Sequence, residues 1–456
     1  MKLFKYLLPL AVATCGMTAS LHAQEGAYST TTEAQQRDFQ SLQEFIKTKR
    51  AISIQEKGGN MSLSGDIRGE WYFMKAKSDG HYLRGWKSKK TKTEKDKGDK
   101  DKGKVKDAKV AKGGKEKSKK KNYIEPEPTN EFDVEANLIL DYTAEKGWGT
   151  IRLQMANSAG IPQIERKDKH TSRNIMYGSG TLDKLALRKC FAGYNVWERG
   201  TSRFDLEIGR RRLYDVFDSR IQFGSYFDGV LARFASSFEG ITDFSLKASA
   251  FVVDQRVEHF AYVGELELLN LWDSGFDLKY SLIHWDREGK NSYQKKHPKG
   301  VRFVNSQVTA AYNLSPDLLN MKAKVYGAYL HNHKAPKWHG SNYKRANDAF
   351  YVGALLGEIV RKGDWSADFC YQWVQAQAVS ERDGTDSCRD NPKAVSFYNK
   401  KWGGTSNYQG WRLEGIYALT DNWTINAHFD RIYEQDRKIG GNHRSFEFYL
   451  ATIFTF

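Results

Sequence analysis

The chain ends in the stretch Phe446-Glu-Phe-Tyr-Leu-Ala-Thr-Ile-Phe-Thr-Phe456, in which nearly every second residue is aromatic or apolar. Two residues is the period at which the side chains of a β-strand return to the same face. The stretch therefore predicts a strand with one apolar face that runs to Phe456. An ordinary edge strand could also end in this way, but a soluble protein that exposed such an edge would risk aggregation.

The same alternation recurs upstream, as in Phe132 to Tyr142 and Trp423 to Asp430, where polar residues stand between the apolar ones. It predicts about sixteen strands. They lie near 62–75, 131–144, 150–158, 183–196, 203–211, 226–235, 243–252, 260–269, 275–283, 302–313, 322–330, 349–360, 365–375, 408–419, 423–431 and 446–456.

The connections between these strands form two alternating classes. Every second connection is short and turn-like, as at Lys146–Gly149 and Thr420–Asn422, whereas the others are mostly longer and more charged, as at 159–182 and 376–407. A membrane barrel with both chain ends on one side has short periplasmic turns and long outer loops. The sequence thus predicts an all-β fold: a transmembrane antiparallel β-barrel over residues 61–456, preceded by a short periplasmic segment.

The first 60 residues differ from the rest. Residues 1–23 have a basic start at Lys2 and Lys5, a short apolar run and a small residue, Ala23, which is the pattern of a secretory signal peptide. Residues 24–60 are polar, and we expect a periplasmic linker or a short helix there. Beyond the signal no apolar run reaches the length of about 18 residues that a transmembrane helix needs.

The net charge of +16 is concentrated in one segment. Residues 87–121 contain 17 lysines and 6 acids and no aromatic residue after Lys87, which is typical of a disordered polyelectrolyte. We expect an outer loop there that binds polyanions or serves as a solvated tether. The sparse cysteines give no disulfide framework, and pairing of Cys370 with Cys388 stays open.

The alternation, together with Phe454 and Phe456 at the end of the chain, resembles the pattern of the porin superfamily of Gram-negative outer membranes. This superfamily includes general, phosphate-selective and alginate-export channels. The resemblance implies a water-filled channel for passive diffusion of small polar solutes and ions. It also implies an outer-membrane location among lipid and lipopolysaccharide, recognition of the C-terminal strand by the barrel-assembly machinery, and a homotrimer as one assembly. The lysine-rich insert belongs to no porin pattern. The alternative is a structural or adhesive barrel that binds polyanions through this insert.

Porins commonly fold their third outer loop into the lumen, and in this chain that loop is about 212–225. Tyr214, Phe217 and Phe223 are expected to pack on the wall, so that the charged residues of the loop face water. The candidate constriction residues are Arg210, Arg211, Arg212, Asp215, Asp218 and Arg220. Opposite charges across a narrow aqueous gap would filter permeating solutes.

The candidate pore-wall residues are cations expected to face the lumen, namely Arg68, Arg152, Arg188, Arg233 and Arg412. They stand among more numerous acids, which argues against a dedicated anion channel. The sequence has no GxSxG or HExxH motif and no base placed beside a nucleophile, so we expect no enzymatic activity. We expect no metal and no cofactor.

Overall fold

The structure is a computed structural model. It describes residues 52–56, 59–78, 81–83, 129–159, 184–254, 259–286, 303–315, 321–335, 337, 345–380, 406–440 and 442–456. The expected signal peptide (1–23), the lysine-rich segment (87–121) and Cys388 lie outside these residues, and so does most of the segment 24–60.

Within the described residues, sixteen long strands form an antiparallel barrel. They are β2 (Gly59–Ser78), β4 (Thr129–Ala144), β5 (Gly147–Ala159), β6 (Lys184–Arg199), β7 (Ser202–Arg212), β8 (Tyr226–Phe238), β9 (Thr242–Asp254), β10 (His259–Leu271), β11 (Phe276–Asp286), β12 (Val304–Leu314), β13 (Ala323–Asn332), β14 (Asp348–Gly357), β15 (Trp365–Val374), β16 (Tyr408–Ala418), β17 (Trp423–Glu434) and β18 (His443–Thr455). The predicted strands match these in order and number, and each predicted end lies within three residues of the observed one.

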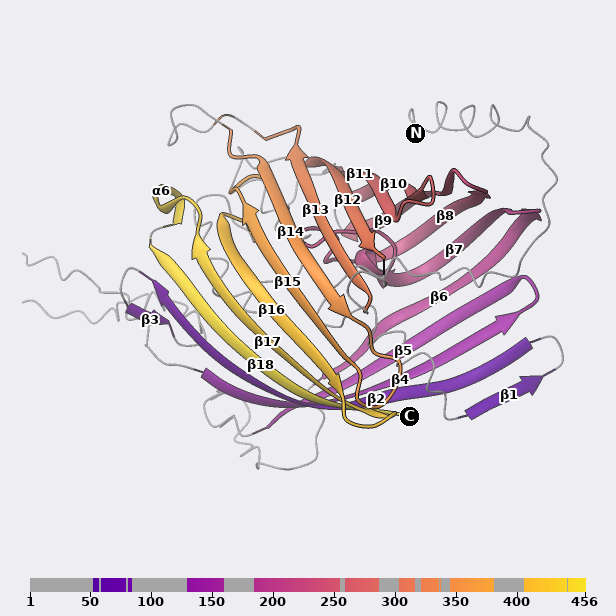
Figure 1. Cartoon of the computed structure of the whole chain (residues 1–456), viewed down its shortest axis with the longest axis horizontal. Helices are drawn as coiled ribbons and strands as arrows, with labels where there is room; N and C mark the ends of the chain where they lie inside the picture. Colours follow the sequence, from indigo (N-terminus) through magenta and orange to yellow (C-terminus); the bar gives the residue numbers. More distant parts are fainter. Residues whose placement is uncertain are drawn as a thin grey trace, which may run out of the picture.

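The barrel closes where its last strand meets its first. β18 pairs with β2 from His443 opposite Ser78 to Thr455 opposite Asp66, so the sheet has no open edge between its first and last strands. Phe456 extends this seam, because its backbone exchanges two hydrogen bonds of 2.9 and 3.0 Å with Gly65. Figure 1 shows β18 lying beside β2, with the C-terminus at that junction. The transmembrane-type barrel expected from the alternation is confirmed as a fold.

Two short strands accompany β2, which is longer than its neighbours. β1 (Ile52–Glu56) pairs with the first residues of β2, Gly59 to Leu63, beyond the point where β18 ends. β3 (His81–Leu83) pairs with the other end of β2, beyond the point where β4 begins. Both cover edge groups that the barrel neighbours leave unpaired. Residues 52–56 of the segment 24–60, for which a linker or a short helix is expected, thus form a strand.

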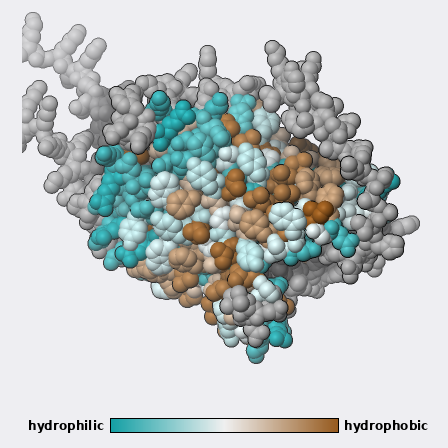
Figure 2. Space-filling model, turned by 45° about the horizontal axis from the view of Figure 1, so that its top comes forward, coloured by the Kyte–Doolittle hydropathy of each residue, from teal (hydrophilic) through white to brown (hydrophobic). Residues whose placement is uncertain are grey.

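Each strand presents two different faces. In β17, Thr424, Asn426 and His428 are buried. Trp423 and Ile425 lie on the other face, and Trp423 is 45 % exposed. The exposed side chains on the outside of the barrel are mostly apolar or aromatic, and many of the side chains inside it are polar or charged. Figure 2 shows hydrophobic residues spread across the visible face and hydrophilic residues gathered at its upper left. A soluble protein has the reverse arrangement, and a barrel in lipid requires this one.

The connections keep the expected order. Short turns follow β4, β6, β8, β10, β14 and β16, on the same side as the C-terminus. Most of the connections after the strands between them are longer, although residues 255–258 alone join β9 to β10. Two of these connections contain described helices: η2 (Leu213–Asp215) between β7 and β8, and α6 (Arg437–Gly440) between β17 and β18. This asymmetry defines a short-turn end and a long-loop end of the barrel.

No helix in the described part of the chain is long and apolar enough to cross a membrane.

Candidate functional site

The third connection at the long-loop end folds into the barrel instead of standing above it. We call residues 213–225, between β7 and β8, the inner loop. Its two legs pair at the base, because the Leu213 N–H donates to the Ser225 carbonyl (2.9 Å) and the Tyr214 N–H donates to the Phe223 carbonyl (3.0 Å). Phe223 has a φ of 71°, which turns the returning leg sharply.

An apolar cluster anchors the first half of the inner loop to the wall. Leu213, Phe217 and Phe223 have no exposed surface, and the Phe217 and Phe223 rings lie 5.5 Å apart. They pack on inward-facing apolar residues of β8 to β11, namely Phe227, Leu231, Phe251, Ala261, Val263, Ile283 and Trp285. The wall is apolar at this place because the loop, not water, covers it. The packing of aromatic loop residues on the wall, expected from the sequence, is confirmed.

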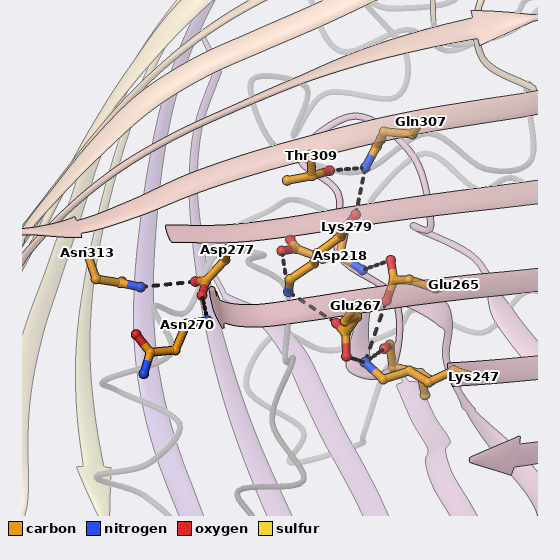
Figure 3. A network of polar contacts seen from close by, with 11 residues as sticks. Asp218, Lys247, Glu265, Glu267, Asn270, Asp277, Lys279, Gln307, Thr309 and Asn313 are labelled. Carbon is orange, nitrogen blue, oxygen red and sulfur yellow. Dashed lines mark hydrogen bonds and ion pairs between the residues drawn. The ribbon is translucent and has the colours of Figure 1, made fainter. Parts of the chain in front are cut away.

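A polar network holds the tip of the loop (Figure 3). The Asp218 carboxylate lies 2.9 Å from the Lys279 ammonium, and Lys279 also lies 3.2 Å from Glu267. The Asp218 N–H donates to Glu265 (3.1 Å), and Gln307 donates to the Asp218 carbonyl (2.7 Å). Lys247 of β9 bridges Glu265 and Glu267 of β10. Four wall strands, β9 to β12, thus contribute to holding one loop position.

The second half of the loop contacts wall strands that come later in the chain than those contacted by the first half. Arg220 forms an ion pair with Asp368 of β15, and its guanidinium lies 4.9 Å from the Tyr326 ring centroid. Tyr326 in turn donates to Asp368 (2.6 Å), and Gln372 donates to the Arg220 carbonyl (2.9 Å). The inner loop therefore makes contacts with wall strands from β6 to β15.

The expected water exposure of the loop charges is wrong. Asp215, Asp218 and Arg220 are 1 %, 6 % and 6 % exposed. Each is neutralised by a wall residue, because a charge that is withdrawn from water needs a partner. Asp215 lies 3.1 Å from the Lys189 ammonium.

Both aspartates of the loop are held in the ionised form. Burial opposes ionisation of Asp218, but Lys279 and Lys324 outweigh it and lower the pKa of Asp218 below its ordinary value. Burial likewise opposes ionisation of Asp215, and the neighbouring cations, Lys189 first, lower the pKa of Asp215. The two carboxylates therefore act as charged anchors of the loop at neutral pH.

The three arginines at the base of the loop point in different directions. Arg211 faces inward, where it pairs with Glu207 (2.6 Å) and donates to the Asp215 carbonyl (3.2 Å). Arg212 is half-buried and donates to the Tyr214 hydroxyl. Arg210 shares the outward face of β7 with exposed Ile208 and pairs there with Asp228 (2.7 Å). Placing Arg210 in the constriction is therefore wrong, because strand alternation directs it away from the lumen.

The five candidate wall arginines all lie on the inward face, but in two settings. Arg68 pairs with Asp66 (2.5 Å) and Arg412 pairs with Asp430 (2.5 Å), and both are buried. The others are half-buried: Arg152, Arg188 and Arg233. Arg152 donates to Asn137 (3.1 Å), Arg188 to Tyr226 (2.9 Å), and Arg233 pairs with Glu207 (3.1 Å). The less buried cations gather on β5, β6 and β8.

Sequence periodicity missed Lys189, which anchors Asp215. The register of β6 against β5 shifts between Lys189 and Leu187, so Arg188 is an extra residue in a β-bulge. A bulge lets two successive side chains point the same way: Arg188 donates to the buried Gln154, and Lys189 pairs with the buried Asp215. Only the pairing register shows this; the sequence around Arg188 has no sign of it.

His428, Asp430 and Glu447 offer possible metal-ligand atoms within 4.8 Å of one another. Both Asp430 oxygens already accept hydrogen bonds from Arg412, at 2.7 and 2.5 Å. A cation at this position would have to displace a buried guanidinium. We interpret the cluster as part of the charged wall.

In the described part of the chain, sixteen long strands form a barrel that is closed by β18 on β2, and the loop between β7 and β8 lies inside it. This is a closed sixteen-stranded antiparallel barrel with one loop folded into it. No family model matches the chain, and no curated protein matches it.

Among solved structures, the chain is similar to OmpF of Salmonella typhi in complex with daunomycin, with 12 % identity, a TM-score of 0.47 and coverage of 89 % of this chain and 100 % of that one. It is also similar to OprB of Pseudomonas putida at high pH, with 9 % identity, a TM-score of 0.46 and coverage of 87 % and 94 %. A mutant porin of Rh. blastica gives 9 % identity, a TM-score of 0.39 and coverage of 87 % and 100 %.

Proposed function

We propose that the protein is an outer-membrane porin, a channel through which small polar solutes and ions diffuse passively, and not an enzyme. The observation that carries the proposal is the inversion of polarity across the wall. Charged residues such as Asp66, Arg68 and Glu70 point inward, whereas the alternate residues Ile67 and Trp71 are 49 % and 38 % exposed outside. Charges in this number have no place against lipid, but they suit a hydrated lumen.

The inner loop gives the channel its proposed constriction. It lies against β6 to β15, so solutes would pass between the loop and the remaining wall, where the half-buried cations Arg152 and Arg188 stand. The charges of Asp215, Asp218 and Arg211 would act through the pairs they form, by setting the field across the gap. Arg212, half-buried at the end of β7, donates to Tyr214 of the inner loop, and we propose that it stands at the entrance. Phe454 and Phe456 remain the proposed signal for the barrel-assembly machinery.

The decisive measurement is conductance. Purified protein added to a planar bilayer should produce stepwise, long-lived current increments, and liposomes that contain it should release small sugars but retain dextrans. Heat-denatured protein at the same detergent concentration serves as the control. Absence of increments at every salt concentration would refute the channel and favour the structural or adhesive barrel.

The adhesive alternative has its own test. Deleting Lys89 to Lys120 should weaken binding of whole cells to heparin while barrel assembly and heat stability stay unchanged. Loss of folding in this deletion would contradict the proposed outer loop. The homotrimer also remains a proposal, which sedimentation in detergent would test.

A further inference from the structure

A second connection at the long-loop end is buried where the inner loop reaches the later wall strands. Residues 376–380 follow β15 and begin the connection to β16. All five are at most 2 % exposed, and two of them, Gln377 and Ser380, are polar. Connections usually run over the surface of a protein, so the burial of five consecutive residues requires specific partners. We call residues 376–380 the latch.

Hydrogen bonds tie the latch to the ends of neighbouring strands. The Gln377 N–H donates to the Ala346 carbonyl (2.6 Å), and the Ala346 N–H donates to the side-chain oxygen of Gln377 (3.0 Å). Asn332, the last residue of β13, donates to the Gln377 carbonyl (2.8 Å). Ser406, just before β16, donates to the Ala376 carbonyl (2.7 Å). The latch is therefore fixed relative to β13, β14 and β16.

Apolar side chains join the latch to the inner loop. Ala378 and Val379 belong to the same buried cluster as Ile221, which lies in the second half of the inner loop and is 1 % exposed. The other members come from the inward faces of β12 to β17, namely Ala311, Tyr326, Leu330, Ala349, Tyr351, Cys370, Val374, Tyr408 and Ile432. The wall, the inner loop and the latch thus contribute side chains to one cluster.

The two halves of the inner loop have separate anchors. The apolar cluster around Phe217, which holds the first half, contains no latch residue among those that the structure describes. The second half is held by the cluster around Ile221 and by Gln372, which donates to the Arg220 carbonyl (2.9 Å). Gln372 also accepts a hydrogen bond from the hydroxyl of Tyr408 (2.8 Å), the first residue of β16. The connection between β15 and β16 therefore holds the second half from both of its described ends.

From this packing we propose that the latch controls the inner loop, so that the second half of the loop leaves the wall only when residues 376–380 move with it. The inference rests on the proposed function, because the position of the loop sets a current only in a channel. Protein interiors are close-packed, so a side chain as enclosed as Ile221 leaves its place only when its neighbours make room. Val379 and Ala378 are the neighbours that belong to a connection and not to a strand.

Cys370 is a natural reporter of this movement. It faces the lumen from β15, is 3 % exposed and belongs to the cluster of Ile221 and the latch. Once the expected signal peptide is removed, Cys190→Ser/Cys388→Ser leaves Cys370 as the remaining cysteine. A small water-soluble maleimide should modify Cys370 only from the open form. When opening is fast compared with modification, the rate follows the population of that form.

The test compares this background with and without Val379→Ala. Two rates are measured on full-length protein in detergent: maleimide modification of Cys370 and tryptic cleavage after the buried Arg220. Val379→Ala removes two methyl groups from the cluster and should raise the open population about tenfold. Both rates should rise together, because a single opening exposes both residues. Gln377→Ala, which removes the side-chain contact with Ala346, should change both rates in the same direction.

The matched control is Val325→Ala, the same truncation at an outward position of β13 that is 47 % exposed. It should leave both rates unchanged. If Val379→Ala and Gln377→Ala gave folded, heat-modifiable barrels with unchanged rates, the latch would not hold the loop. A rise in only one of the two rates would overturn the proposal as well, because the loop and the latch would then move separately. Neither rate depends on conductance, so the latch and the channel fail independently.

Discussion

Replacing Phe217 by alanine should release the inner loop from the wall. Phe217 is completely buried, lies 5.5 Å from the Phe223 ring and belongs to the apolar cluster that joins the loop to β8–β11. Truncation of a buried Phe to Ala costs about 3–5 kcal/mol. The loop is the part of this cluster that can move, because the wall residues are fixed by the strand pairing. We therefore expect most of that cost to appear as a lower free energy of loop opening.

Trypsin can report the opening. Arg220 is the only basic residue of the loop between Leu213 and Ser225, and it is 6 % exposed in the closed position. When opening is fast compared with cleavage, the cleavage rate follows the population of the open form. A loss of about 3 kcal/mol raises that population about 150-fold. Cleavage after Arg220 should therefore accelerate by about two orders of magnitude, and channel currents should become larger and noisier.

Phe238→Ala is the control for this prediction. Phe238 ends β8 at the short-turn end and is 51 % exposed, so the same substitution there removes no contact with the loop. It should leave cleavage after Arg220 slow. If Phe217→Ala kept an intact, heat-modifiable barrel and was cut no faster than the unaltered protein, the apolar cluster would not be what holds the loop.

Three further predictions concern the seam and the charges of the loop. Gly65→Ala should lower the free energy of unfolding by ~1–3 kcal/mol, because its Cβ would lie 2.4 Å from a backbone oxygen and 2.7 Å from the C-terminal ring; Gly69→Ala, with its nearest atom at 3.5 Å, should be close to neutral in the same urea titration. Asp215→Asn/Asp218→Asn removes the carboxylate partners of Lys189 and Lys279, so the reversal potential should shift toward anion selectivity. An unchanged reversal potential would contradict the proposed constriction. Both aspartates have lowered pKa values in the folded state, so their stabilisation is complete above the ordinary Asp pKa of 3.8 and is lost as the pH falls below it; current noise from an opening loop should rise there and stay low from pH 5 to 8.

The alternation of residues determined most of the fold by itself. A strand has a period of two whatever lies around it, so the apolar outer face of Phe446 to Phe454 could be assigned from local sequence alone. The two classes of connection then oriented the strands, and the strand ends followed to within three residues. The inward position of Arg68 and Arg412 also follows from the alternation alone.

Tertiary structure decided the contacts that the alternation of residues along a strand cannot specify. Lys189 faces the lumen because a bulge at Arg188 interrupts the alternation, and a bulge belongs to the pairing of two strands. Asp218 is buried because the loop lies on the wall against Lys279, 61 residues away in sequence. Strand periodicity is a local property of the backbone. The neutralisation of a buried charge depends on which distant residues the closed barrel brings within a few ångströms of it, and those distances arise only when the register of all the strands is set.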